Sequence, residues 1–184
     1  MEAHLPALQI VIPLLSAPLC VVLRRRRPAY LLALAASWTA FAIAVALLRE
    51  VSRLGVVTYA MGGWAAPWGI EYRIDPLGAF VLFFVSAIGA LTLTYAPPSL
   101  DREVPRERHY LFHAAYMLCL TGLLGIAITG DLFNLFVFLE ISALSTYVLI
   151  SLGRDRRALT AAFLYLVMGT IGATFILIGI GLMY

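Results

Sequence analysis

Six long runs of apolar residues divide this chain, and short polar or arginine-bearing segments separate them. Each run has the length at which a helix crosses a membrane, about 20 residues for a hydrocarbon layer about 30 Å thick. We therefore predict an all-α fold, a polytopic bundle of six transmembrane helices. The predicted spans are Leu5–Leu23, Tyr30–Leu48, Leu77–Ala96, Tyr110–Thr129, Leu132–Leu152 and Leu159–Tyr184.

The connection between the second and third spans has a strand-like pattern instead. Apolar side chains alternate with other residues on both sides of the turn signal Gly62-Gly63. They are Val57, Tyr59 and Met61 before the turn and Ile70, Tyr72 and Ile74 after it. Alternation with a period of two around glycines is typical of a β-hairpin. We predict a short extracytoplasmic hairpin that packs on the bundle, with Trp64 and Trp68 at the level of the lipid headgroups.

The composition requires a membrane environment, because 62% of the residues are hydrophobic and only 12% are charged. A soluble domain of 184 residues has too small a core to bury this much apolar surface. All 13 basic residues are arginines, and they fall in short clusters between the spans rather than on one basic face. The expected partner is the lipid bilayer, and nucleic-acid binding is not expected.

The arginines are distributed unequally between the connections. Ten lie in the first, third and fifth connections, whereas Arg49, Arg53 and Arg73 lie in the second. Because cytoplasmic loops carry the excess of basic residues, the N-terminus is predicted to lie outside the cell. The third connection, Pro97–Arg108, mixes both signs of charge. We interpret it as a solvated cytoplasmic connector, with docking of a partner as the alternative.

One carboxylate, Glu140, interrupts the otherwise uncharged stretch Leu132–Leu152. It lies nine residues after Asp131, about 13 Å along a helix axis and therefore near the middle of the hydrocarbon layer. An acid at that depth costs a few kcal/mol, so such residues are rare and usually functional. No arginine of the chain lies at the same depth, so a cation or water chain that acts on this acid must come from elsewhere. The expected chemistry is proton carriage or cation coordination, and the alternative is a protonated acid in a structural hydrogen bond.

Three further residues are candidates for the proton or ion pathway, each with a structural alternative. Asp131 is suited to capping the fifth helix or to a proton exit. Tyr147 lies seven residues after Glu140 on the same helix face, where it would line a water wire. His113, near the start of the fourth span, either packs at the interface or admits protons.

The segment Gly130–Glu140, with the sequence GDLFNLFVFLE, resembles the antiporter-like subunits of Mrp sodium/proton antiporters. These subunits are related to the proton-pumping membrane subunits of respiratory complex I and of membrane-bound hydrogenases. Two more segments, Tyr165–Phe175 and Glu71–Leu77, are similar to parts of the Mrp D-type subunit. The resemblance covers essentially the whole chain and identifies it with the N-terminal portion of such a subunit.

The resemblance implies that Glu140 matches the family's fifth-helix glutamate. That glutamate pairs with a lysine on a broken seventh helix, so that protons move along a hydrated axis at mid-membrane. The implied protein is a subunit of an Mrp or complex I-like assembly in the inner (plasma) membrane, which moves protons and exchanges them for sodium. No covalent chemistry is expected in this chain, even within an NADH:quinone oxidoreductase-like or hydrogenase-like complex. No cofactor or metal is expected, because the sequence has no ligand cluster for haem, iron–sulfur or flavin.

Two departures from the family pattern limit what the resemblance implies. Leu164 stands where the family commonly carries a lysine, so no basic role is carried over to it. The chain ends at Tyr184, before the broken seventh helix, so it is expected to be part of a longer subunit or half of a split one. In this interpretation residues 1–108 form the N-terminal helices, and residues 109–184 begin a proton-conducting inverted repeat. The competing hypothesis is a transport-incompetent scaffold that packs against true pump subunits.

Overall fold

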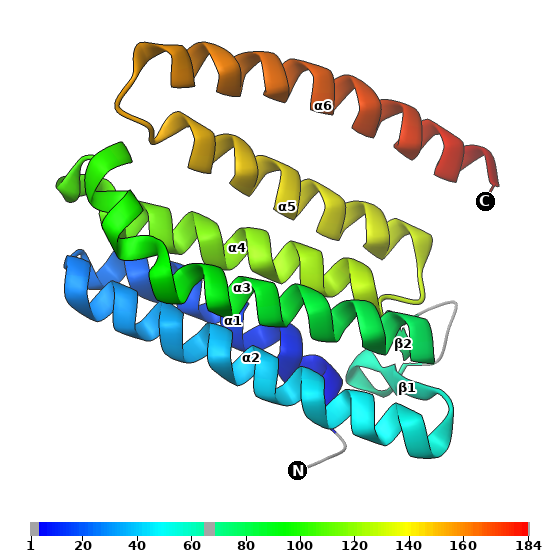
Figure 1. Cartoon of the computed structure of the whole chain (residues 1–184). Coiled ribbons are helices and arrows are strands. Elements are labelled where there is room, and N and C mark those ends of the chain that lie inside the picture. Colours follow the sequence, from blue (N-terminus) through cyan, green and yellow to red (C-terminus); the bar gives the residue numbers. More distant parts are fainter. Residues whose placement is uncertain (1–3, 65–68, 184) are drawn as a thin grey trace.

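The computed structural model describes residues 4–64 and 69–183 and contains the six predicted helices (Figure 1). Each helix is long and apolar enough to cross a membrane, so this is a multi-pass membrane protein. The helices are α1 (Leu5–Leu23), α2 (Arg26–Leu54), α3 (Pro76–Glu103), α4 (His109–Ile128), α5 (Leu132–Ser151) and α6 (Arg156–Met183). The other described elements are strands β1 (Val57–Ala60) and β2 (Glu71–Ile74) and the 3₁₀ turns η2 (Met61–Gly63) and η3 (Arg106–Arg108).

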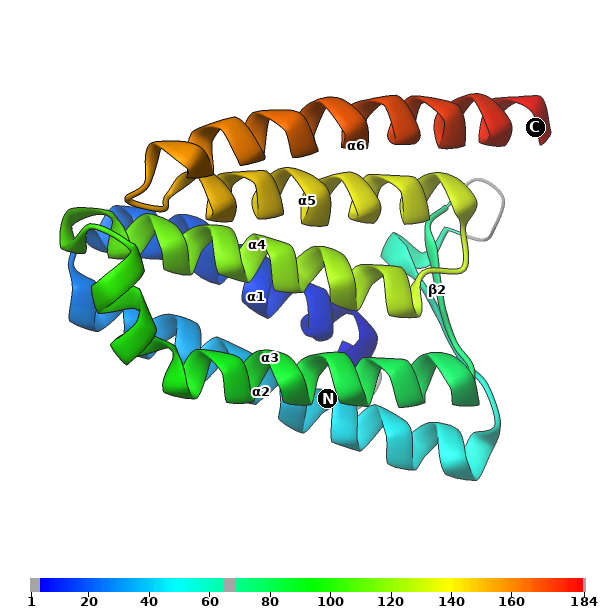
Figure 2. The same ribbon diagram turned by 45° about the horizontal axis from the view of Figure 1, so that its top comes forward.

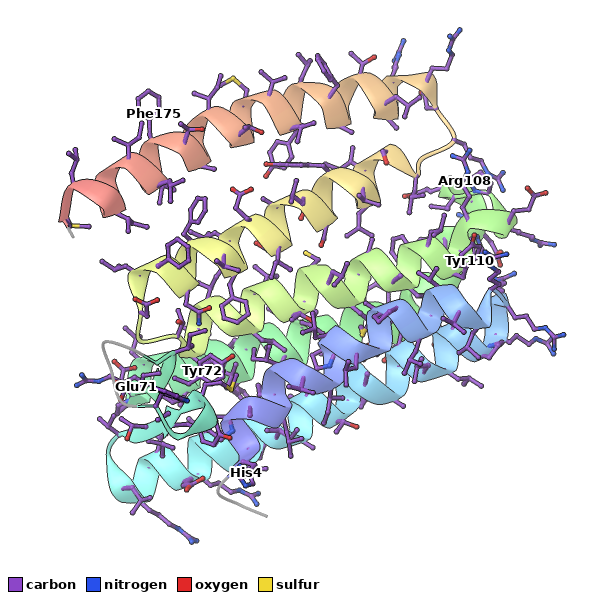
Figure 3. The ribbon with its side chains drawn as sticks, turned by 180° about the vertical axis from the view of Figure 1, so that it is seen from behind. His4, Glu71, Tyr72, Arg108, Tyr110 and Phe175 are labelled. Carbon is purple, nitrogen blue, oxygen red and sulfur yellow. The ribbon has the colours of Figure 1, made fainter. Side chains whose placement is uncertain are left out.

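The central helix of the bundle is α4, and 56% of its most apolar stretch is buried within the chain. It packs against α1 and α3, with α2 behind them, and its other side is covered by α5 (Figures 1 and 2). The outermost helix, α6, packs mainly against α5, and only 6% of its apolar stretch is buried. The exposed side of α6, on which Phe175 projects away from the bundle (Figure 3), therefore faces lipid or another protein.

The helices on the α1–α3 side approach closely because one face of α2 is made of small residues. This buried face repeats an alanine every three or four positions, at Ala29, Ala33, Ala36, Ala40 and Ala44. The hydrophobic effect does not drive helix association within lipid, so van der Waals contacts between closely packed helices have to stabilise it. The small side chains of α2 allow that contact and leave α4 in the middle of the bundle.

The connection predicted at Pro97–Arg108 is shorter than the sequence suggested. Helix α3 continues through both of its late prolines to Glu103 and bends in this region (Figure 2). A proline removes a backbone donor and kinks a helix without necessarily ending it. The turn after the bend buries Leu100 in a small cluster with Val104 and Leu152, and this packing favours its helical form. The predicted end of this span at Ala96 is therefore wrong, although most side chains of the added turns, Leu100 apart, remain at least partly exposed.

The predicted hairpin is present as the antiparallel pair β1 and β2. Val57 lies opposite Ile74, and Tyr59 lies opposite Tyr72. Tyr72 and Ile74 are buried against the bundle, in agreement with the expected packing role. Burial, with a smaller effect of the neighbouring Tyr59, raises the pKa of the Tyr72 hydroxyl above its ordinary value. The hydroxyl therefore stays neutral at physiological pH.

The turn of the hairpin begins one residue earlier than predicted. Met61 is the first residue of η2 instead of a strand residue, and its backbone N–H donates to the carbonyl of Ile70 at 2.8 Å. The two glycines that follow Met61 both have positive φ, which residues with a side chain rarely adopt. Trp64 is exposed beyond this turn, and Trp68 lies outside the described residues.

Candidate functional site

The start of α5 is fixed by its cap and by the hairpin. Asp131 is the N-cap residue, and its carboxylate accepts the backbone N–H of Asn134 at 2.8 Å. The Asn134 amide donates to the Thr129 hydroxyl at 3.0 Å, which ties the cap to the end of α4. The backbone N–H of Gly130 donates to the carbonyl of Glu71 in β2 at 3.0 Å. The hairpin therefore holds the α4–α5 turn and sets the position of α5 (Figure 3).

One face of α5 is a close packing surface against α4. Gly122 and Gly125 of α4 make room for it. A Cβ atom on Gly122 would lie 2.7 Å from the carbonyl oxygen of Phe138 and from the backbone nitrogen of Ser142. A Cβ atom on Gly125 would overlap the Phe138 ring. Side chains buried on α5 include Asn134, Phe138, Ser142 and Ser145, whose spacing of three and four residues defines this face.

Glu140 lies outside this packing face. Its side chain is only half-buried, and it stands near the middle of the 20-residue helix, about 12 Å from its first residue. Tyr147 lies two helical turns further along on the same face. Both ion pairs within the described residues involve Asp101, so Glu140 has no cationic partner among them. Any cationic partner of Glu140 would therefore lie outside the described residues.

Tyr147 connects this face of α5 to α6. Its ring meets the ring of Tyr165 edge-on, with the ring centroids 5.2 Å apart. Its hydroxyl lies against the backbone of Gly169, where a Cβ atom would overlap it, whereas a Cβ on Gly172 would touch nothing within 4 Å. The two helices run antiparallel (Figure 1). Glu140 is therefore level with the part of α6 beyond Gly172, where α6 packs less closely against α5 than it does at Gly169.

Asp131 and His113 are not gathered around Glu140. Asp131 is at the first turn of α5, at the hairpin end of the bundle. His113 is 2% exposed near the other end, and its ring lies beside Tyr30 of α2 with the centroids 5.6 Å apart. Glu140 and Tyr147 thus share one face of α5, about 10 Å apart along its axis, and the other two predicted residues lie at opposite ends of the bundle. No group of three His, Cys, Asp or Glu side chains suited to a metal ion occurs in the part of the chain that the structure describes.

Two features of the site were missed in the sequence. The first is the role of Gly122 and Gly125, although small residues within an apolar span are a known signal of close helix packing. The second is an ion pair between Arg26 at the start of α2 and Asp101 near the end of α3, at 2.6 Å. These two residues are 75 positions apart, so no local pattern indicates that they meet.

Comparison with known proteins places this geometry in a family. The model of the family described as NADH:quinone oxidoreductase/Mrp antiporter, TM, matches residues 129–184, which include Glu140. The NADH-quinone oxidoreductase subunit N of Desulforudis audaxviator (strain MP104C) is 44% identical over 187 residues, covering the whole chain and 37% of that relative. The D-type subunit of the Na(+)/H(+) antiporter of Bacillus subtilis (strain 168) is 33% identical over 178 residues, covering 96% of the chain and 36% of that relative.

The fold is also similar to a solved structure, that of the Mrp complex from Dietzia sp. DQ12-45-1b. The TM-score is 0.87 at 29% identity, and the match covers the whole chain and 34% of the chain in that complex. This chain therefore spans just over a third of the length of the relatives it matches.

Proposed function

We infer that this chain, which belongs to the NADH:quinone oxidoreductase/Mrp antiporter family, is a membrane subunit of a multi-subunit complex that moves protons. It corresponds to the N-terminal part of the family's subunits. The proposed carrier is Glu140, which takes up and releases a proton near mid-membrane in exchange for transport of a cation such as sodium. A single observation carries the proposal: an acid half-buried in the middle of α5, on a face that α4 does not cover.

A proton carrier must change its proton affinity during the transport cycle. A cation within about 4–6 Å stabilises the carboxylate form, and its withdrawal favours the protonated form. The described residues place no arginine beside Glu140, and the adjoining part of α6 is open. We propose that a basic residue on a segment or subunit that covers α6 supplies this cation.

The proposed pathway joins Asp131, Glu140 and Tyr147 along α5, with His113 at the arginine-bearing end of the bundle. Nine residues separate Asp131 from Glu140, and seven separate Glu140 from Tyr147, or about 13 Å and 10 Å along the axis. Protons move between groups in hydrogen-bond contact, about 2.7 Å apart for oxygens. Direct transfer between these side chains is therefore impossible, and bound water has to connect them.

We propose that the hairpin end of the bundle faces the outside and that the protein lies in the inner (plasma) membrane. The three connections rich in arginine are those between α1 and α2, α3 and α4, and α5 and α6. In Figure 3, Arg108 and Tyr110 lie at one end of the bundle, and His4, Glu71 and Tyr72 lie at the other. The excess of basic residues supports the arginine-bearing end as the cytoplasmic one.

The division of the chain at residue 108 is proposed as the start of the conducting repeat, with the N-terminal helices before it. The central helix α4 packs against α1, and buried residues from both parts, such as Leu47 and Leu124, belong to one hydrophobic core. Residues 1–108 and 109–184 are thus not separate folding units. In the proposal, α4 to α6 begin the conducting repeat, and α1 to α3 with the hairpin support it.

The proposal is tested by Glu140→Gln in the assembled complex, reconstituted in vesicles. Glutamine keeps the shape and the hydrogen-bonding capacity of the side chain but neither ionises nor releases a proton. Cation-dependent proton flux, followed with a pH-sensitive dye, is expected to fall to the level of empty vesicles. The matched control is Glu107→Gln in η3, an exposed site outside the apolar spans, which should leave the flux unchanged.

The alternative is a scaffold that only packs against transporting subunits. In that case Glu140→Gln would leave both the flux and the assembly of the complex intact, and this result would overturn the proposal. The scaffold hypothesis gives no reason for a half-buried carboxylate in the middle of α5, since its structural cost would bring no benefit. The geometry therefore supports transport better.

A further inference from the structure

A cavity of about 260 Å³ opens at the arginine-bearing end of the bundle, far along α4 from the hairpin. Side chains from the start of α2, the bend of α3 and the start of α4 line it. Those with polar atoms are Arg26, Arg27, Tyr30, His109 and His113. The cavity is smaller than the usual site for a drug-sized ligand but has room for several water molecules or a small group. Of the residues in the proposed proton pathway, His113 alone lines this cavity, and the three on α5 do not.

The lining of the cavity favours an anion. Arg26 is held in place by Asp101, whose other carboxylate oxygen is 3.5 Å from Arg106. Arg27 is exposed, and within the described residues it has no acidic partner. Helix α2 begins at Arg26 without a side-chain cap or an acidic residue in its first turn, so its positive dipole end is uncompensated. The net charge around the cavity is positive even when Asp101 is counted.

The histidines of the cavity carry unused hydrogen-bonding groups. His109 is fully buried and His113 is 2% exposed. The Nε2 atom of His109 lies 3.1 Å from the carbonyl oxygen of Val104, but the Nδ1 atoms of both rings have no partner. A buried polar atom without a hydrogen bond is costly and usually marks a place for water or a ligand. The hydroxyl of Tyr30 is already used, since it donates to the carbonyl of Thr94.

We propose that this cavity binds a phosphate group, supplied by the headgroup of an anionic lipid or by inorganic phosphate. Arginine suits this ligand because its planar fork of donors matches two phosphate oxygens at once. The Nδ1 atom of His113 can present an N–H to the phosphate in one ring tautomer, whereas His109, whose Nε2–H donates to the Val104 carbonyl, offers Nδ1 as a donor only when its ring is protonated. The position at the end of apolar helices suits a headgroup, because basic pockets between transmembrane helices bind anionic lipids there. Arg27, which has no acidic partner within the described residues, is the arginine that would contact the negatively charged phosphate.

The test uses the chain labelled with ¹⁵N-histidine in an uncharged detergent. The sequence has three histidines, and His4 is an internal control because it lies at the opposite end of the bundle (Figure 3). Short-chain phosphatidylglycerol, short-chain phosphatidylcholine and inorganic phosphate are titrated separately. Phosphatidylglycerol is expected to shift the ring signals of His109 and His113 and to leave His4 unchanged. A matching response to inorganic phosphate would identify the free anion as a ligand, and a response to the lipid alone would identify the headgroup.

The specificity of the site is tested with Arg27→Gln and its matched control, Arg25→Gln. Both replacements remove one positive charge from the same exposed segment, but Arg25 does not line the cavity. Loss of one basic contact is expected to weaken binding by about fivefold for Arg27→Gln and hardly at all for Arg25→Gln. Equal losses for both variants, an equal shift of His4, or equal binding of phosphatidylcholine would overturn the proposal.

Discussion

The hydroxyl of Tyr147 lies against the backbone of Gly169, in the space that a Cβ atom would otherwise occupy. Together with the edge-on contact between Tyr147 and Tyr165, this close approach fastens α6 to α5. The described residues of α6 that are buried, Ala162 and Ile180, lie on either side of this contact, and the rest of the helix buries little surface. The same contact positions Tyr147 on the face that carries Glu140.

Replacement Gly169→Ala is expected to loosen α6 by displacing the Tyr147 ring. Alanine by itself favours a helix by about 1 kcal/mol over glycine. Overpacking of a tight contact costs about 1–3 kcal/mol, so the net free energy of unfolding should fall by roughly 1 kcal/mol. Thermal unfolding of the purified chain in detergent measures this change. Gly172→Ala is the matched control, and it should be neutral or stabilising because nothing lies within 4 Å of its Cβ position.

The displaced group in this prediction is the Tyr147 hydroxyl, so Tyr147→Phe should partly rescue Gly169→Ala. A double-mutant cycle separates this coupling from the separate effects of the two replacements. Additive losses, or a Gly169→Ala variant as stable as Gly172→Ala, would show that Tyr147 does not hold α6 at this point.

A larger loss is expected for Gly122→Ala, at the interface between α4 and α5. Its Cβ would meet backbone atoms of Phe138 and Ser142 at 2.7 Å, and backbone cannot swing aside as a side chain does. The helices would have to separate, at a cost of roughly 2 kcal/mol in the free energy of unfolding. Gly125→Ala meets the Phe138 ring instead, its Cγ included, so Phe138→Ala should rescue it in part and should not rescue Gly122→Ala. Rescue of both variants in denaturation assays would contradict this packing.

The sequence was sufficient to predict the elements that depend on local patterns. The six helices follow from uninterrupted apolar runs, and the hairpin follows from alternation around two glycines, whereas its register, which pairs Tyr59 with Tyr72, was not predicted. The cap at Asp131 was predicted for a similar reason, because capping depends on residues three positions apart. The extension of α3 to Glu103 was missed because two prolines were interpreted as the end of a helix. Burial of Leu100 in tertiary contacts offsets their effect.

The surroundings of the candidate site were less predictable. Helical periodicity placed Glu140 on a face away from Ser142 and Ser145, in agreement with the burial of both serines and the half-buried position of Glu140. Which helix covers each face depends on packing between segments distant in the sequence, and no local pattern encodes it. The cavity with Arg27 is an example, since three helices contribute to it. Such sites become visible only when the ends of those helices are seen side by side.

Two replacements of Asp131 test its two candidate roles separately: one keeps the helix cap but removes the negative charge, and the other removes both. Asparagine also caps helices, so Asp131→Asn should keep the free energy of unfolding within a few tenths of a kcal/mol, whereas Asp131→Ala should lose about 1 kcal/mol. In the proposed pathway the carboxylate takes part in proton release, so Asp131→Asn is expected to lower proton flux in vesicles despite a stable fold. Thermal unfolding in detergent and dye-monitored flux in the assembled complex supply the two measurements. The asparagine amide cannot take up or release a proton as a carboxylate does. Full flux in a stable Asp131→Asn variant would therefore show that Asp131 only caps the helix. The part of the proposed pathway on α5 would then contain Glu140 and Tyr147 alone.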